Sequence, residues 1–463
     1  MRIALVHYHL RRGGVSSVIL NQARSLAKAG ADILLIMGED AQTEFPFAKV
    51  EDLCYNPLPQ GEEGARLLAE GILRAMDNRW GEPADVIHVH NPLIQKNPLL
   101  IGALRILIER GCRLLLQNHD LAEDFRPDVY IGGEYPENCH YAVINSRDYD
   151  FLIQAGLVKE GLYLIPNEVS CLAASAGMER TRYLYPVRAI RRKNIGEALL
   201  LSLFIPKGRT VAITLPASEK DYGKYERWTN FAAALNLPVE FGIGTKMSLQ
   251  DLLGSAVCAV TTSVKEGFGF SFLEPWTAGR SLAGRRIDYV CKDFENSGVR
   301  FDSLYSSLEI PKTFIDVNSV EQKMEDAMRR IYSAFGLTVP TGIIETSKND
   351  LAKKDTIDFG RLDEELQESV IRGLCEIPQK KRQIIAHNPA LEKMFDHEED
   401  AELLEANNSA IRKQYGKERI SELLMSVYQK VIDRPVSQKL SKTALLELYL
   451  DPKRLSLVGI SDG

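Results

Sequence analysis

The sequence lacks the features that mark disulfide-stapled, zinc-ribbon or membrane-spanning proteins. Its seven cysteines include no C-x-x-C pair, which argues against a zinc ribbon, a thioredoxin motif or a disulfide framework. No run of about 18 apolar residues occurs, so no transmembrane helix is predicted. The start, MRIALVHYHL, has an apolar run too short for a signal peptide. Scattered thiols without a leader are typical of a cytoplasmic protein.

An excess of positive charge is also missing. The chain has 57 Lys and Arg against 63 Asp and Glu, which gives a formal net charge of −6. A dedicated nucleic-acid binder has a basic footprint, so we expect no nucleic-acid partner. The sequence contains no G-x-S-x-G elbow, Walker A loop, H-E-x-x-H pair, kinase motif set or G-x-G-x-x-G fingerprint. These absences exclude several common enzyme classes from first consideration.

The 463 residues do contain an ordinary globular composition, with 45% hydrophobic and 26% charged residues. Strand and helix patterns alternate from residue 2 to residue 167, and the alternation starts again near residue 181. Short loops between such elements predict an α/β fold made of two Rossmann-like, doubly wound domains with parallel sheets. Ligands of such sheets bind at the carboxyl ends of the strands, so two domains facing a cleft can hold two substrates.

The pattern changes near residue 315, where segments rich in Glu, Lys, Arg and Leu predict extra C-terminal helices. We place one of these helices at 399–432 and a polar loop at 346–358. The predicted parts are an N-terminal Rossmann-like domain, a C-terminal Rossmann-like domain with the helical elaboration, a further long helix, and a tail. Their ranges are 1–175, 176–395, 396–433 and 434–463.

The strongest chemical signal is SVKEGFGFSFLEPWTAG, residues 263–279. Glu266 and Glu274 are separated by seven residues, with Gly267, Phe268 and Gly269 between them at the end of a predicted strand. A Gly-x-Gly backbone can approach a ligand closely and expose N–H groups at a helix N-terminus, where anions are favoured. A carboxylate about two turns later can accept two hydrogen bonds from a vicinal diol such as a ribose.

The second signal is YPVRAIRRKNIGEALL, residues 185–200. Arg188 and Lys193 lie at a predicted strand end and at the start of the next helix. Two cations there can hold a diphosphate, and each charge-assisted hydrogen bond contributes roughly 1.5–3 kcal/mol. Arg191 and Arg192 add further positive charge.

Two turns of the first domain also present polar groups at strand ends. Gly13 and Gly14 occupy the first strand-to-helix turn, where main-chain N–H groups can reach a phosphate or an acceptor. The segment QNHD places His119 and Asp120 at the end of a later strand. His88 and His90 share one strand face, but two ligands without a third make a poor zinc site. We interpret His90 and Asn91 as lining of the cleft.

The segment that holds both glutamates resembles the E-x7-E motif of retaining GT-B glycosyltransferases, especially those of glycosyltransferase family 4. Arg188 and Lys193 match the family's G-R-x-x-x-x-K segment, in which Val187 here replaces the glycine. VINSRDYDFLIQAGLVKEGLYLIPNEVS is similar to the family's segment before the interdomain linker. The resemblance covers residues 2–290 well and 385–432 more loosely. It implies that the domain at 1–175 lies on the acceptor side, that the domain at 176–395 lies on the donor side, and that the helix at 396–433 closes the fold by crossing back to the N-terminal domain.

The resemblance implies a role for each matching residue. Glu266 would contact the donor sugar, Glu274 the ribose of the nucleotide, and His119 would be the active-site histidine. The implied catalytic residues are Glu266 and His119. The implied donor-binding residues are Arg188, Lys193, Gly267, Phe268, Gly269, Glu274 and Gly14. The implied acceptor-side residues are Gly13, Asp120 and Asn91.

The implied activity is transfer of a hexose from a nucleotide-diphosphate sugar to a hydroxyl acceptor with retention of configuration. Arg188, Lys193 and helix N-termini can neutralise the departing diphosphate, so no metal ion and no other cofactor is expected. Asp148 and Asp150 superficially match the D-x-D metal motif, but i and i+2 point apart on a helix, so we assign both to a solvated helix face. The acidic balance favours a soluble sugar or small polar acceptor over a lipid.

Other activities stay open on the residue types alone. The same fold can support a sugar-nucleotide epimerase or a glycoside phosphorylase. A catalytically idle GT-B-like scaffold that binds a partner through its C-terminal helices is a third alternative. Inversion of configuration would need a general base, for which His119 and Asp120 are the nearest candidates.

Overall fold

The computed structural model describes residues 1–57, 61–395 and 400–460. The chain divides into two compact units. Unit 1 comprises Met1–Val169 and Lys413–Leu450, and unit 2 comprises Ser170–Arg412 and the segment that begins at Asp451. No helix in the described ranges combines the length and the apolar character needed to cross a bilayer.

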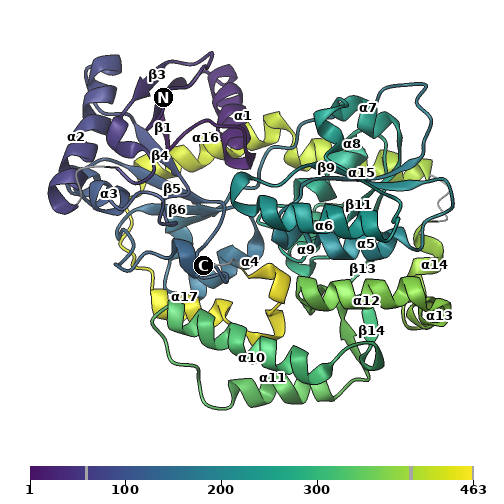
Figure 1. Cartoon of the computed structure of the whole chain (residues 1–463). Helices are drawn as coiled ribbons and strands as arrows, with labels where there is room; N and C mark the ends of the chain where they lie inside the picture. The colour runs from purple at the N-terminus through teal and green to yellow at the C-terminus, as the bar shows by residue number, and fades with distance from the viewer. Residues whose placement is uncertain (58–60, 396–399, 461–463) are drawn as a thin grey trace. The chain divides into compact units, whose positions relative to one another are not determined.

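Unit 1 is built on a seven-stranded parallel sheet in the order β3-β2-β1-β4-β5-β6-β7 (Figure 1). Its strands are β1 (Arg2–His7), β2 (Asp32–Met37), β3 (Phe47–Lys49), β4 (Val86–His90), β5 (Leu114–Asn118), β6 (His140–Val143) and β7 (Leu162–Leu164). Its helices are α1 (Gly14–Lys28), α2 (Gly61–Trp80), α3 (Leu100–Glu109), α4 (Ser146–Gln154), α16 (Lys417–Asp433) and α17 (Lys442–Tyr449).

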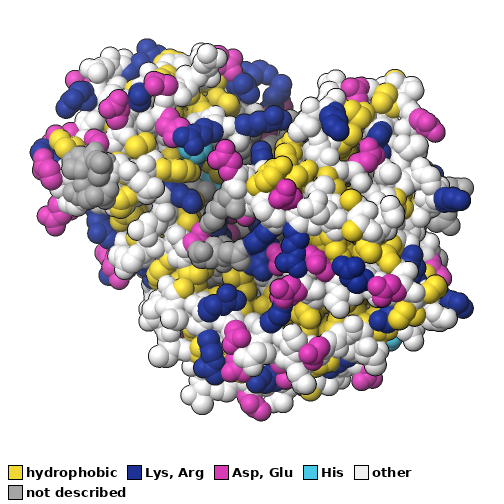
Figure 2. Space-filling model, in the orientation of Figure 1, with side chains coloured by type: hydrophobic (Ala, Val, Ile, Leu, Met, Phe, Trp, Pro, Cys, Tyr) yellow, Lys and Arg dark blue, Asp and Glu magenta, His cyan; other side chains and the backbone are white. Residues whose placement is uncertain are grey.

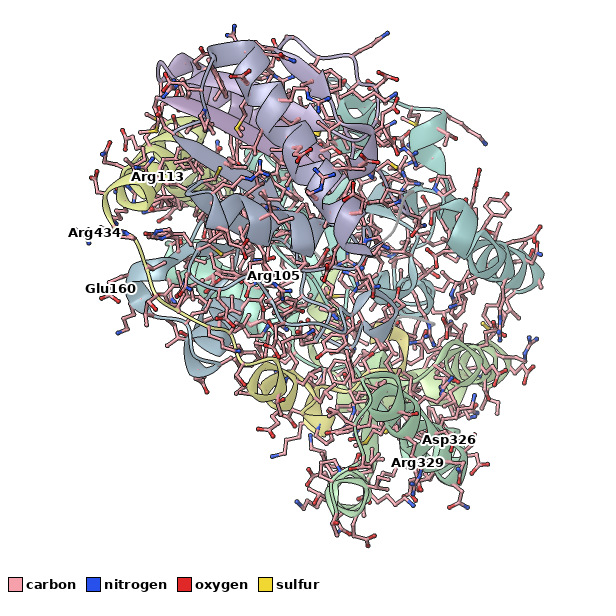
Figure 3. The ribbon with its side chains drawn as sticks, turned by 90° about the vertical axis from the view of Figure 1, so that its left-hand side faces the viewer. Arg105, Arg113, Glu160, Asp326, Arg329 and Arg434 are labelled. Atoms are coloured by element: carbon pink, nitrogen blue, oxygen red, sulfur yellow. The ribbon has the colours of Figure 1, made fainter. Side chains whose placement is uncertain are left out.

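Both faces of this sheet are covered, as the continuous apolar strands require. Successive side chains of β1 point to opposite faces because a strand has a period of two. Ile3 and Leu5 pack with α1 and α16, whereas Ala4 and Val6 pack with α2 and α3. Helix α16 lies beside α1 although it comes near the end of the chain (Figure 1). Figure 3 labels Arg434, the residue that follows α16, and His140 hydrogen-bonds its carbonyl oxygen at 2.9 Å.

Unit 2 contains a second parallel sheet, with six strands in the order β10-β9-β8-β11-β12-β13. Its strands are β8 (Arg182–Arg188), β9 (Thr210–Leu215), β10 (Val239–Phe241), β11 (Ala256–Thr261), β12 (Leu282–Arg285) and β13 (Leu304–Tyr305). Its first helices are α5 (Ile195–Ser202), α6 (Tyr222–Ala234), α7 (Leu249–Gly254), α8 (Glu274–Thr277) and α9 (Asp288–Asn296). Two parallel sheets flanked by helices confirm the predicted fold class.

The C-terminal part of unit 2 is the predicted helical elaboration, with an added hairpin. Strands β14 (Glu309–Pro311) and β15 (Thr356–Asp358) pair antiparallel. The helices are α10 (Val317–Ala334), α11 (Ile343–Ala352), α12 (Glu364–Glu376), α13 (Pro378–His387), α14 (Ala390–Met394) and α15 (Ala401–Tyr415). A buried ion cluster helps to hold the hairpin on the sheet, because Arg285 of β12 lies 2.6 Å from Glu197 of α5 and 2.7 Å from Asp358 of β15.

Two predictions about this region are wrong. The stretch 346–358 is not a loop, because it continues α11 and then forms β15, where tertiary contacts override its polar composition. Leu351 is buried, and Lys312 donates a hydrogen bond to its carbonyl oxygen. The single helix expected at 399–432 is two helices, α15 and α16, which are interrupted at Gly416. The start of the expected closing helix, 396–399, lies outside the described residues.

The prediction that Asp148 lies on a solvated helix face is also wrong. Its side chain is buried and accepts hydrogen bonds from Tyr449 Oη at 2.6 Å and from Arg147 Nη2 at 2.8 Å. Asp150 on the same helix is exposed, as predicted. Asp148 therefore fastens α17 to α4, a contact that local sequence could not reveal because its partner is about 300 residues away.

We expect Asp148→Ala to lower the free energy of unfolding by about 1.5–3 kcal/mol, because it leaves the buried Tyr449 hydroxyl without its acceptor and leaves Arg147 with only Asp124 as its carboxylate partner. Urea titrations followed by circular dichroism measure this change. Asp150→Ala is the matched control, since it removes an equal charge from the same helix at an exposed position, and its effect should stay within about 0.5 kcal/mol. Equal effects of the two substitutions would contradict the anchoring role.

Candidate active site

The predicted donor-binding residues of unit 2 lie at one edge of its sheet. Strands β8 and β11 are parallel neighbours, so the segments that follow them leave the sheet side by side. Tyr185 Oη donates to the carbonyl oxygen of Lys193 at 2.8 Å, and Val264 N–H donates to the carbonyl oxygen of Arg192 at 3.0 Å. These bonds fix the turn that carries Lys193 against the loop that carries Glu266.

Lys193 and Glu266 form a buried ion pair in which the ammonium donates to Oε1 of the carboxylate. The guanidinium of Arg192 lies 3.4 Å from the other carboxylate oxygen. Burial alone would raise the pKa of Glu266, but the charges of Lys193 and Arg192 outweigh it and hold this pKa below its ordinary value. The structure thus joins two residues that the sequence assigned to separate tasks, and it keeps the carboxylate ionised at neutral pH.

Glu274 is the other carboxylate of the motif, and its surroundings differ sharply. It opens the single turn of α8, where Thr277 Oγ1 donates to its main-chain oxygen at 2.7 Å. Within the described part of the chain, no side chain forms an ion pair or a hydrogen bond with its carboxylate. Burial raises the pKa of Glu274 to about 7. A largely buried carboxylate with no protein partner is suited to accept hydrogen bonds from the hydroxyls of a ligand.

The residues between the two glutamates turn the chain sharply. Gly269 has φ +89°, and a Cβ there would lie 2.9 Å from Val290 Cγ1, so glycine is required. The Phe268 ring is buried and contacts Phe270 and Phe294 edge-on, with centroids 5.1 and 5.4 Å away. The Phe268 side chain therefore belongs to the core, and only the main chain of this residue is placed to meet a ligand.

Arg188, the second predicted cation of the diphosphate clamp, forms no hydrogen bond or ion pair with Lys193 or Glu266 among the described residues. It is exposed at the end of β8, and its Nη1 donates to the carbonyl oxygen of Pro216 at 3.2 Å. No described carboxylate forms an ion pair with it, so its charge is available to an anion. Lys and Arg side chains are elsewhere interspersed with Asp and Glu on the face shown in Figure 2.

The predicted residues of unit 1 fall in two turns at strand ends. Gly13 is the N-cap residue of α1, with extended backbone, and Gly14 is the first residue of the helix. A Cβ at Gly13 would meet only the Arg11 carbonyl oxygen at 3.8 Å, and one at Gly14 would meet nothing within 4 Å. The fold of unit 1 does not demand either glycine. The open space lies over the first turn of a 15-residue helix, where unpaired N–H groups favour an anion.

His119 follows β5 and is held by two residues that follow or end β4. Its main-chain N–H donates to Asn91 Oδ1 at 2.7 Å, and its Nε2 lies 3.0 Å from Nδ1 of His90. The Asn91 side chain, predicted to face the acceptor, is thus occupied in positioning His119. Asp120, the other predicted acceptor-side residue, has its carboxylate 3.3 Å from Arg126 Nη1. The sequence did not lead us to predict the contact between His90 and His119. The signal that could have indicated it is the adjacency of strands β4 and β5 in the sheet.

Burial sets the protonation of this histidine cluster. It lowers the pKa of His119 to about 4 and that of His7 to about 3. His90, with no exposed surface, has its pKa lowered well below the ordinary value for the same reason. Across the described residues, no three His, Cys, Asp or Glu side chains are arranged to hold a metal ion.

Solved structures share the architecture of the whole chain at low sequence identity. Sucrose-phosphate synthase from Thermosynechococcus elongatus aligns over 92% of this chain and 98% of its own, with TM-score 0.54 and 14% identity. HepE from Anabaena, solved with UDP and glucose, aligns over 93% and 99%, with TM-score 0.56 and 13% identity. The catalytic domain of starch synthase IV from Arabidopsis thaliana, bound to ADP and acarbose, aligns over 94% and 99%, with TM-score 0.53 and 11% identity.

These likenesses, together with the two doubly wound sheets, place the chain among proteins with the GT-B fold of glycosyltransferases. No protein-family model matches the chain. Its sequence is similar to the mannosylglucosyl-3-phosphoglycerate synthase of Petrotoga mobilis, with 28% identity over 414 residues that span 78% of this chain and 79% of the relative. This similarity to a sugar-transferring enzyme agrees with the resemblance found in the sequence.

Proposed function

We propose that this protein is a retaining glycosyltransferase of family 4 type, which moves a hexose from a nucleotide-diphosphate sugar to a hydroxyl of a small polar acceptor without a metal ion. The observation that carries the proposal is the Glu274 carboxylate, which is largely buried and has no partner among the described residues, eight positions after the ionised Glu266. A ribose diol would donate hydrogen bonds to Glu274, and a hydroxyl of the donor sugar would donate one to Glu266. In this proposal, unit 2 binds the nucleotide part of the donor.

The Petrotoga mobilis relative helps to define the chemical class of the acceptor. Its name describes a product that combines two hexoses with phosphoglycerate. An acceptor of this kind is soluble and anionic, which agrees with a preference for small polar molecules over lipids. The open first turn of α1, with Gly13 and Gly14, is where unit 1 would receive a negatively charged group. All seven cysteines are free, which supports the cytoplasm as the proposed compartment.

The proposed reaction proceeds on one face of the donor sugar. The acceptor oxygen forms a bond to the anomeric carbon while the bond from that carbon to the diphosphate oxygen breaks. The hydroxyl proton passes to the departing diphosphate, so no protein nucleophile is required. Arg188 and Lys193 stabilise the negative charge that grows on the leaving group. Glu266 holds the donor sugar through its hydroxyls, and the charge of Lys193 keeps it in the ionised, accepting form.

One experiment tests activity, metal dependence and stereochemistry together. The protein is incubated with α-linked UDP-, GDP- or ADP-hexoses and a sugar phosphoglycerate acceptor in EDTA, and the first-formed product is examined by NMR. We expect an α-linked product that forms at the same rate with and without EDTA.

Each part of this proposal has an outcome that would overturn it. A β-linked product would contradict retention. Loss of activity in EDTA that Mg²⁺ or Mn²⁺ restores would contradict metal independence. An altered nucleotide sugar without transfer would point to the epimerase, and a sugar phosphate formed from a glycoside and phosphate to the phosphorylase. If no donor were turned over, the catalytically idle scaffold would be the remaining alternative.

A further inference from the structure

His90 lies at the centre of the histidine cluster and has no exposed surface. Its ring stacks on His88 with centroids 4.3 Å apart, and it is nearly parallel to the ring of His119 at 5.4 Å. Its Nδ1 makes the only ring hydrogen bond that connects it to the described residues, the 3.0 Å contact with His119 Nε2. Its Nε2 is fully buried and has no hydrogen-bond partner in the part of the chain that the structure describes.

Both rings are neutral near pH 7, because burial lowers their pKa values far below the ordinary value. A neutral imidazole has one N–H and one bare nitrogen. The bond between His90 and His119 therefore has two possible arrangements, which differ in the ring that donates. In each arrangement, the ring that donates has a bare second nitrogen, and the ring that accepts carries its hydrogen on its second nitrogen. The second nitrogens are Nε2 of His90 and Nδ1 of His119.

The two arrangements leave different buried groups without a hydrogen-bond partner. If His119 donated, the hydrogen of His90 would sit on Nε2 as a buried N–H with no acceptor. If His90 donates from Nδ1, its Nε2 is a bare acceptor, and an unsatisfied acceptor is found in protein interiors more often than an orphaned N–H. The tautomer of His7 follows directly from its partner. Its Nδ1 must donate because the atom 3.0 Å away is the carbonyl oxygen of His90, which can only accept.

We infer that His90 donates its Nδ1 hydrogen to Nε2 of His119, and so holds His119 with its own hydrogen on Nδ1. That nitrogen of His119 makes no hydrogen bond with a described residue, yet it is not among the fully buried atoms that lack partners. It is consequently the ring nitrogen within reach of a bound molecule. His119 then offers that molecule an N–H, which suits a hydroxyl or phosphate oxygen as acceptor.

This inference deepens the proposed function and rests on it for its catalytic meaning. A His119 that presents N–H cannot take a proton from the acceptor hydroxyl. The arrangement removes His119 as the general base that an inverting reaction would need, and it makes His90 a positioning residue that acts through His119. Asn91, which binds the main-chain N–H of His119, completes the support.

The direct test is the tautomer of His119 in the full-length protein, which two-bond ¹⁵N–¹H correlation spectra report after histidine-selective labelling. Absence of one signal in His119→Gln assigns it. We expect His119 to carry hydrogen on Nδ1 in the wild type. A His119 with hydrogen on Nε2, or a doubly protonated ring at neutral pH, would overturn the inference.

Variants of His90 test the cause. His90→Asn can place an amide N–H at the former Nδ1 position and should keep the His119 tautomer, whereas His90→Leu should shift it toward Nε2–H. With the preferred donor, His90→Leu should lower kcat by about tenfold with KM nearly unchanged, and His90→Asn should recover most of that loss. An unchanged tautomer in His90→Leu would show that His90 does not set it.

His140→Asn is the matched control, because this buried histidine of the same sheet contacts the carbonyl oxygen of Arg434 instead of the cluster. It should change neither the tautomer nor the kcat. The spectra decide the inference even if no sugar is transferred. Failure of the proposed function and failure of this inference are therefore distinguishable.

Discussion

Lys193→Ala should lower kcat by about 100-fold, a loss of about 2.7 kcal/mol in transition-state stabilisation. Lys193 lies in the turn that follows β8, where the hydrogen bond from Tyr185 fixes its main chain and the Glu266 carboxylate holds its ammonium. As the bond to the diphosphate breaks, negative charge grows on the leaving group, and a preorganised cation in a buried site stabilises it strongly. Steady-state rates at saturating donor give the value.

A second explanation of the same loss must be separated, because Lys193 also holds Glu266. The double variant with Glu266→Gln answers this. If Lys193 acts only through the carboxylate, its removal in the Glu266→Gln background should cost nothing further; if it contacts the diphosphate, most of the effect should persist. Arg192→Ala is the matched control, since it removes the more exposed cation near Glu266, and its effect should be below about tenfold. A Lys193→Ala enzyme with normal kcat would contradict the clamp.

Glu274→Gln should weaken donor binding by about tenfold and yet stabilise the free protein by about 1–2 kcal/mol near pH 8. The folded-state pKa of Glu274 is raised from 4.5 to about 7, so the folded protein favours the protonated acid. At a pH below both values the group is protonated in both states and has no effect. Between pH 4.5 and 7 the unfolded state ionises this carboxyl freely while the folded state keeps it protonated in its largely buried position, so stability is lost over that range and levels off above pH 7. The neutral glutamine avoids that loss.

Urea unfolding of the wild type and of Glu274→Gln between about pH 5 and pH 8 tests this sign, and the advantage of the variant should grow with pH. Calorimetric titration with the preferred donor gives the affinity. Glu226→Gln is the matched control, because it is an exposed glutamate of the same unit and should alter neither quantity. A variant that is less stable at high pH, or that binds the donor as tightly as the wild type, would exclude Glu274 as the ligand of the ribose.

The alternation of strands and helices was readable from the sequence because it follows from local periodicity. Continuous apolar strands such as RIALVH, and helices ended by glycine, are properties of short segments. The motif with Glu266 and Glu274 was likewise visible, because a Gly-x-Gly turn after a strand is a local signal. Helix α11 was missed for the opposite reason, since its polar composition favours a loop and only its buried contacts select the helix.

By itself the sequence determined the fold class, and it singled out the residues that carry the proposed chemistry. Tertiary structure alone decided which of these residues meet. It paired Lys193 with Glu266, left the Glu274 carboxylate without a partner among the described residues, turned Asp148 inward to Tyr449, and set His90 against His119. The physical reason is that pairing and burial, which set charge and protonation, depend on neighbours brought together from distant parts of the chain. Local patterns carry no record of those neighbours.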